Sequence, residues 1–207
     1  MDEMAVRREL ADAGGLLYRM GYAVGTGGNL SARCGDVVLM TPTGVSLGEL
    51  KPERLSRLTM DGRLLEGEPP TKEASMHLGC YRARPDCRAV AHLHSTHATA
   101  VACLADLADE PIPPLTPYYL LRVGRLGYVP CFLPGSKELA QAVEQAAAKH
   151  RSILLANHGP VVMGQSIREA LHTSQELEQA AQMFLLLRGM KTSPIPPDQL
   201  AQLRAKL

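Results

Sequence analysis

Short strands joined by tight turns are the feature that most limits how this chain can fold. Gly35-Asp36 and Asp61-Gly62 each separate two short strand-like segments. Glycine beside aspartate is typical of two-residue hairpin loops. Residues 153–156 and 161–163 predict a further hairpin. Because these hairpins outnumber strand–helix–strand crossovers, the sequence predicts an α/β fold with a mainly antiparallel sheet and helices packed on its faces.

Helical periodicity and capping residues predict the helices between these strands. Thr71 and Ser95 are expected N-caps, and Ser166 with Glu169 reads as a capping box. Gly14-Gly15 is expected to loosen the first helix. The remaining strands are expected over residues 88–94 and 127–132. The expected helices cover residues 2–22, 71–84, 95–107, 118–123, 136–150 and 166–188, with a short one near the C-terminus.

Composition excludes several classes of protein. The 22 basic and 21 acidic residues nearly cancel, and only 4% of residues are aromatic, which argues against a nucleic-acid partner. No stretch approaches the roughly 20 apolar residues of a membrane helix, and the N-terminus does not resemble a signal peptide. The five cysteines are dispersed, which argues against a disulfide framework. The sequence therefore predicts a cytoplasmic protein with no membrane partner.

Three histidines form a pattern typical of a metal site. His92 and His94 are one residue apart on an expected strand, so both imidazoles are expected on one face. His158 follows the strand over residues 153–156, at a turn where ligands often converge. Three histidines with an open fourth position are typical of a catalytic zinc site. The structural alternative is a chance His-x-His pair and a histidine that caps a turn.

Glu73 stands in the first turn of the helix expected from Thr71. The helix dipole stabilises a carboxylate there, so Glu73 is either a surface acid or a general acid/base directed at the metal. His77 lies four residues further on the same helical face and is interpreted as a structural residue. The other histidines of the chain are not expected to bind metal: His97, His150 and His172.

Small-residue loops provide candidate anion sites. Gly27-Gly28-Asn29 and Thr43-Gly44 offer backbone N–H groups that suit a phosphate. Thr71-Lys72 adds a hydroxyl, helix N-terminal amides and a positive charge. None of these loops matches a Walker or dinucleotide-binding motif, and each is an ordinary turn on its own.

Taken in chain order, these motifs resemble the class II aldolase/adducin family over roughly residues 5–188. The resemblance implies a single α/β/α domain over residues 1–190, followed by a proline-containing C-terminal tail over residues 191–207. It also implies a homotetramer with active sites at subunit interfaces. The motifs that carry it are Gly28-Asn-Leu-Ser31, Thr41-Pro-Thr-Gly44, Pro70-Thr-Lys-Glu73, His92-Leu-His94 and Asn157-His-Gly159.

The same resemblance implies roles for individual residues. Glu73 falls on the catalytic acid/base, which also contacts the metal in that family. Tyr119 falls on a tyrosine lent to a neighbouring subunit's site, with Tyr118 as the alternative one register away. The implied cofactor is a divalent metal, Zn²⁺ first, with Mn²⁺ or Co²⁺ as alternatives. The implied metal-binding histidines are His92, His94 and His158, and the implied phosphate-binding residues are Gly28, Asn29, Thr43, Gly44, Thr71 and Lys72.

Within the family, residues 92–97, 113–119 and 155–160 look most like the 3-oxo-tetronate 4-phosphate decarboxylase branch. This implies a carbon–carbon lyase that converts a small phosphorylated sugar acid to CO₂ and dihydroxyacetone phosphate through a metal-stabilised enediolate. Retro-aldol cleavage forms the same intermediate. The site residues therefore do not exclude three alternatives. In descending order these are a fuculose- or rhamnulose-phosphate aldolase, a methylthioribulose-phosphate dehydratase and a non-catalytic adducin-like interaction module. Substrate stereochemistry is equally open.

Overall fold

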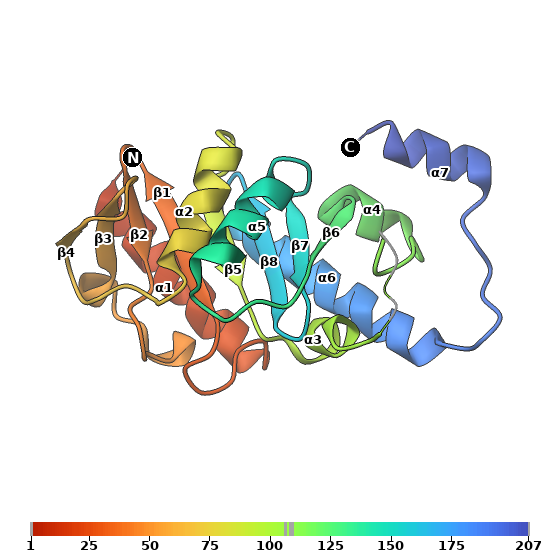
Figure 1. Ribbon diagram of the computed structural model, residues 1–207, viewed down its shortest axis with the longest axis horizontal. Coiled ribbons are helices and arrows are strands. Elements are labelled where there is room, and N and C mark those ends of the chain that lie inside the picture. Colours follow the sequence, from red (N-terminus) through yellow and green to blue (C-terminus); the bar gives the residue numbers. More distant parts are fainter. Residues whose placement is uncertain (1, 106, 108–109, 207) are drawn as a thin grey trace.

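The computed structural model describes residues 2–105, 107 and 110–206, which are built around one eight-stranded sheet (Figure 1). The strand order is β4-β3-β2-β1-β5-β8-β7-β6, and all neighbouring pairs are antiparallel except β6 and β7. The prediction of a mainly antiparallel sheet is confirmed. The strands are β1 (Asn29–Cys34), β2 (Val37–Met40), β3 (Ser56–Thr59), β4 (Leu64–Glu66), β5 (Ala89–His92), β6 (Leu126–Val129), β7 (Ser152–Leu155) and β8 (Gly159–Gly164).

Helices cover both faces of this sheet, with α2 and α5 on one face and α1 and α6 on the other (Figure 1). Side chains alternate between the faces, as the strand period requires. Val38 and Met40 belong to the core under α2 and α5, whereas Leu39 belongs to the core under α1 and α6. The helices are α1 (Glu3–Arg19), α2 (Ala74–Ala83), α3 (Thr96–Ala102), α4 (Pro117–Val123), α5 (Lys137–Ala147), α6 (Ile167–Leu187) and α7 (Pro197–Arg204).

Gly14 does not loosen α1, contrary to the sequence expectation. The helix is continuous, and a Cβ at Gly14 would lie 2.5 Å from Leu50 Cδ1. Leu50 directly follows the 3-10 turn η1 (Leu47–Glu49), and a second turn, η2 (Pro52–Arg54), comes next. The glycine therefore lets this segment pack closely against α1.

Two other elements end earlier than expected. β6 ends at Val129, because Pro130 has no N–H with which to extend the strand. α3 ends at Ala102, whereas the sequence predicted an end near Leu107. The predicted range includes Asp106, which lies outside the described residues. Ser95 precedes α3 but makes no side-chain cap. Glu178 of α6 instead accepts the N–H groups of His97 and Ala98, each at 2.8 Å.

Among the described residues, no helix has the combination of length and apolar character that a membrane crossing requires.

Candidate active site

The three histidines of the predicted metal site converge at one end of the central strand β5. His92 is the last residue of β5 and pairs with Asn29 of β1 on one side and Val161 of β8 on the other. His94 lies beyond the end of the strand, and its backbone N–H donates to the Tyr22 carbonyl at 3.2 Å. The expectation that both histidines lie on a strand is therefore wrong for His94, although both side chains reach the same point.

A tight turn between β7 and β8 brings His158 to this point. Residues 156–158 connect Leu155 to Gly159, which face each other across the hairpin. Asn157 has a φ of 55°, a left-handed conformation that asparagine tolerates better than most residues. The His158 N–H closes the turn by donating to the Leu155 carbonyl at 3.1 Å.

The ring nitrogens of this histidine triad (His92, His94 and His158) face one another. His92 Nε2 lies 3.2 Å from His94 Nε2 and 3.2 Å from His158 Nε2. His92 Nδ1 donates to the Pro160 carbonyl at 3.0 Å, which leaves its Nε2 without a proton. Burial, followed by the charges of His158 and His94, holds the pKa of His92 well below its usual range. His92 therefore presents a neutral Nε2, the form that binds metal.

Glu73 is buried beside the triad and is not a surface acid. It occupies the N-cap position of α2 and is only 8% exposed. Its Oε2 lies 3.3 Å from His92 Nε2 and accepts a hydrogen bond from Asn29 Nδ2 at 2.9 Å. Its Oε1 lies 3.6 Å from His158 Nε2 and is buried without a hydrogen-bond partner. Of the two interpretations of Glu73, the structure supports the one directed at the metal site.

The helix that follows begins later than predicted. α2 starts at Ala74 and not at Thr71, because residues 69–71 lie against residues 41–43 as a short antiparallel pairing. The Thr71 N–H donates to the Thr41 carbonyl at 3.1 Å, and the Thr43 N–H donates to the Pro69 carbonyl at 2.9 Å. This pairing brings the Thr43-Gly44 loop beside Thr71 and Lys72.

All six predicted phosphate-binding residues line one cavity of about 400 Å³. Glu73, His94 and His158 line the same cavity, so the small-residue loops and the triad share a single space. Gly27, part of the first predicted loop, also lines the cavity, and the sequence interpretation assigned no role to three further lining residues: Thr26, Pro42 and Pro134. Pro134 comes from the segment between β6 and α5, and no motif in that segment indicated that it reaches the site.

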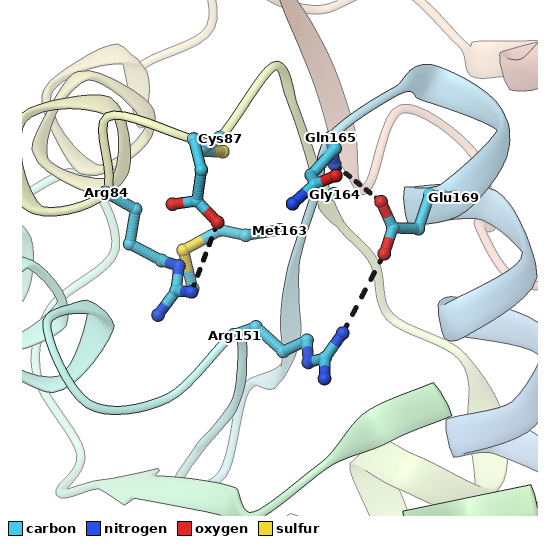
Figure 2. A pocket seen from close by; sticks show the side chains of 8 residues that line it. Arg84, Cys87, Arg151, Met163, Gly164, Gln165 and Glu169 are labelled. Atoms are coloured by element: carbon cyan, nitrogen blue, oxygen red, sulfur yellow. Dashed lines mark hydrogen bonds and ion pairs between the residues drawn. The ribbon is translucent and has the colours of Figure 1, made fainter. Parts of the chain in front are cut away.

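The opposite end of β5 has a much smaller hollow of about 30 Å³ (Figure 2). Two of its lining residues are arginines, but each already pairs with a carboxylate. Arg84 lies 3.4 Å from Asp86, and Arg151 lies 3.8 Å from Glu169. This hollow therefore lacks both the space and the available cation that an anionic ligand would need.

Two adjacent tyrosines on α4 differ sharply in exposure. Tyr119 is 3% exposed, and its hydroxyl donates to the Ile112 carbonyl at 3.2 Å within the same chain. Tyr118 is 66% exposed. In this structure Tyr118 is the tyrosine that is available to another molecule.

The residues at the triad fit a divalent cation. Nitrogen ligands of a tetrahedral zinc ion lie about 3.3 Å apart, because each Zn–N bond is about 2.0–2.1 Å long. His92 Nε2 lies 3.2 Å from each of the other two ring nitrogens, and all three lie within 4.8 Å of one another. The unpartnered Glu73 Oε1 would gain a positive neighbour. Histidine nitrogens with a carboxylate are a donor set that suits zinc and related metals.

Gly159 controls the spacing between His158 and the segment that carries His94. A Cβ at Gly159 would lie 2.3 Å from the Leu93 carbonyl oxygen, a contact that only a backbone shift can relieve. We expect Gly159→Ala to weaken metal binding at least tenfold and to destabilise the fold by about 1–3 kcal/mol. Metal titration and thermal unfolding measure both effects. Gly189→Ala is the matched control, since Gly189 also has a positive φ and is strained by a Cβ, but nothing lies within 4 Å of that Cβ. Equal metal affinity in both variants would contradict the role of Gly159 in spacing the two histidine-bearing segments.

Comparison with known proteins agrees with this geometry. The family "Class II Aldolase and Adducin N-terminal domain" matches residues 8–185. A curated 3-oxo-tetronate 4-phosphate decarboxylase of Haemophilus influenzae is 45% identical over 92% of this chain and 92% of that protein. An L-fuculose phosphate aldolase of Methanococcus maripaludis is 38% identical over 85% of this chain and 94% of that protein.

Solved structures show the same fold. The crystal structure of YgbL from Escherichia coli superposes with a TM-score of 0.96 at 41% identity, covering 99% of this chain and 100% of that chain. The family match spans most of the chain and includes all three histidines of the triad, Glu73 and the small-residue loops. This protein belongs to the family of class II aldolases and adducin N-terminal domains.

Proposed function

We propose that this protein is a metal-dependent carbon–carbon lyase that converts 3-oxo-tetronate 4-phosphate to dihydroxyacetone phosphate and CO₂. The observation that carries the proposal is one cavity that combines a histidine triad, a buried carboxylate and phosphate-type loops. The similarity to proteins named for this decarboxylation, which extends over nine tenths of both chains, supports this choice of reaction.

The residues of the cavity have separate tasks in this reaction. A divalent cation held by the triad supplies Lewis-acid stabilisation of negative charge on the substrate oxygens. The phosphate is held by the small-residue loops and the residues before α2, and this contact orients the substrate. The residues in this role are Gly28, Thr43, Gly44, Thr71 and Lys72. Release of CO₂ breaks the C1–C2 bond, and its electron pair is delocalised into the 3-oxo group. Glu73 delivers a proton to C2, which completes dihydroxyacetone phosphate.

Oε1 of Glu73 is the oxygen suited to carry that proton. Oε2 is already occupied by the Asn29 amide, whereas Oε1 has no partner. Asn29 therefore has a different task from the other cavity loops. It lines the cavity, but its amide nitrogen serves the carboxylate.

An aldolase that cleaves a fuculose-type phosphate is the second candidate. The similarity to an L-fuculose phosphate aldolase favours it, and the cleavage needs the same charge stabilisation and the same proton carrier. The identity to that aldolase is lower and covers less of this chain, so we rank it second.

We propose Zn²⁺ as the metal, with Mn²⁺ and Co²⁺ as alternatives, since a ligand set of three imidazoles suits all of them. We further propose a homotetramer in which a tyrosine of α4 reaches a neighbouring subunit's site. The 66% exposure of Tyr118 favours that residue over the buried Tyr119. The cytoplasm is the proposed compartment, because all five cysteines are free thiols.

The decisive experiment supplies purified, Zn²⁺- or Mn²⁺-loaded protein with 3-oxo-tetronate 4-phosphate and, separately, with L-fuculose 1-phosphate. We expect stoichiometric CO₂ and dihydroxyacetone phosphate from the first substrate and turnover at least about 100-fold slower with the second. Both substrates yield dihydroxyacetone phosphate, so release of CO₂ or of an aldehyde distinguishes the reactions. Cleavage of the fuculose phosphate alone would select the aldolase, and turnover of neither substrate would reject both.

A further inference from the structure

A buried chain of hydrogen bonds leads away from Glu73 into the protein, between β1 and α2. Asn29 Nδ2 lies 2.9 Å from Glu73 Oε2, and Asn29 Oδ1 lies 2.5 Å from His77 Nε2. His77 Nδ1 lies 2.7 Å from Ser31 Oγ, which in turn lies 2.7 Å from the Tyr81 hydroxyl. We call these five residues the buried relay.

Two backbone periods place the buried relay in register. Asn29 and Ser31 are two residues apart on β1, so their side chains lie on the same face of the sheet. Glu73, His77 and Tyr81 are spaced by four residues along α2, so they follow one face of the helix. All five are buried, with exposures of 0–8%. The hydrogen bonds among Ser31, His77 and Tyr81 are therefore shielded from bulk water, whereas Asn29 and Glu73 also line the cavity.

The chemistry of the groups determines the direction of every hydrogen bond. Glu73 Oε2 accepts from Asn29 Nδ2, so Asn29 turns its NH₂ group toward the carboxylate and its carbonyl oxygen toward His77. His77 Nε2 must then carry the proton that Asn29 Oδ1 accepts. His77 Nδ1 accepts from the Ser31 hydroxyl, and Ser31 accepts from Tyr81. One arrangement satisfies all five residues.

Burial keeps the relay residues in the states that this arrangement requires. It lowers the pKa of His77 to about 3, so the imidazole stays neutral near pH 7. Burial also raises the pKa of Tyr81 well above its usual range, so the hydroxyl keeps its proton. Both ring nitrogens of His77 are already hydrogen-bonded, Nε2 to Asn29 and Nδ1 to Ser31, so neither is available to a metal. His77 therefore belongs to the support of the site and not to its metal ligands.

We propose that His77 is a positioning residue that locks the amide of Asn29, and through it the carboxylate of Glu73. Without His77, the Asn29 amide keeps only its bond to Glu73, and its side chain gains freedom to rotate. A rotated amide no longer donates to Glu73 Oε2, so the carboxylate loses the contact that holds it in place. In its native position the carboxylate keeps Oε2 occupied and Oε1 free beside His158. This inference rests on the proposed function in one respect, the role of Glu73 as proton carrier.

The kinetic test compares His77→Phe with His77→Gln. Phenylalanine removes both hydrogen bonds, and we expect kcat to fall about 10–100-fold with KM and metal content changed less than twofold. Glutamine retains an N–H donor that can reach Asn29 Oδ1, and we expect it to restore kcat to within about fivefold of the native enzyme. His172→Gln, on the exposed face of α6, is the matched control and should not change kcat.

The structural test uses metal-free protein and needs no activity. In ¹⁵N-labelled native protein and His77→Gln, we expect slow exchange of the Asn29 side-chain amide protons with water, and in His77→Phe exchange at least tenfold faster. The two tests separate this proposal from the proposed function. A native enzyme that releases no CO₂ overturns the function, whereas the amide exchange still tests the lock.

Two results would overturn the proposal that His77 holds the Asn29 amide in place. One is unchanged exchange of the Asn29 amide protons in His77→Phe, and the other is a fall in kcat accompanied by an equal loss of metal. If His77→Phe does not fold, His77→Gln decides. A folded His77→Gln with fast Asn29 exchange, or with a kcat more than tenfold below native, rejects the proposal.

Discussion

His92→Ala is expected to abolish stoichiometric metal binding and to lower kcat/KM at least about 10³-fold. Lewis-acid stabilisation contributes several kcal/mol to such a reaction, and each 1.4 kcal/mol corresponds to about a factor of ten in rate. His92 is fully buried, and its Nε2 lies within 3.3 Å of His94, His158 and Glu73. Its Nδ1 is anchored to the Pro160 carbonyl, which fixes the orientation of Nε2. Elemental analysis of protein purified without chelator measures the metal directly.

The control for this prediction is His172→Ala on α6, which removes an exposed histidine that does not line the cavity of the triad. It should retain native metal content and native kcat. A His92→Ala protein that is folded and still carries about one metal ion per chain would show that the triad is not the metal site. Loss of metal from both variants would point to a nonspecific effect of purification, and would equally contradict the prediction.

Glu73→Gln is expected to retain metal while kcat falls about 10²–10⁴-fold, the usual contribution of a general acid/base. Glutamine has nearly the same shape as glutamate but cannot carry the proton. The triad still provides three nitrogen ligands, so metal content should stay within twofold of native. The experiment measures kcat, KM and metal content on the same preparation.

Glu53→Gln is the matched control, since Glu53 is exposed on η2 and away from the cavity residues. It should not change kcat. If Glu73→Gln keeps near-normal turnover, the assignment of Glu73 as proton carrier is wrong. If it loses metal as completely as His92→Ala, Glu73 is an essential ligand, and its role in proton transfer must be tested in another way.

Local patterns in the sequence were sufficient to predict most of the strands and turns, and to select residues that meet in one cavity. Gly35-Asp36 and Asp61-Gly62 do form turns between paired antiparallel strands. His92, His94 and His158 do converge, and the six predicted phosphate-binding residues do share one cavity. These features depend on strand period, on turn chemistry and on the order of short motifs, which neighbouring residues encode.

Features that depend on distant partners could not be read in the same way. The sequence left Glu73 open as a surface acid or as an acid/base directed at the metal. In the structure, residues 69–71 pair with residues 41–43, the helix starts later, and the Glu73 side chain is buried. The predicted order of strand, helix and strand allows a parallel pair of β6 and β7 across α5, but only the structure shows that these two strands are neighbours. Tyr118 and Tyr119 are adjacent and chemically equal, and only the packing of α4 decides which one is buried.

The role of His77 shows this division most clearly. Its four-residue spacing from Glu73 is visible in the sequence, as is the two-residue spacing of Asn29 and Ser31. Whether the β1 residues face the α2 residues depends on how α2 packs against β1. That packing joins Asn29 to Glu73 and His77, which are 44 and 48 positions further along the chain. The sequence by itself determined which groups can do the chemistry. The tertiary structure decided which of them meet, because burial and hydrogen-bond partners arise from contacts between segments that are remote in the chain.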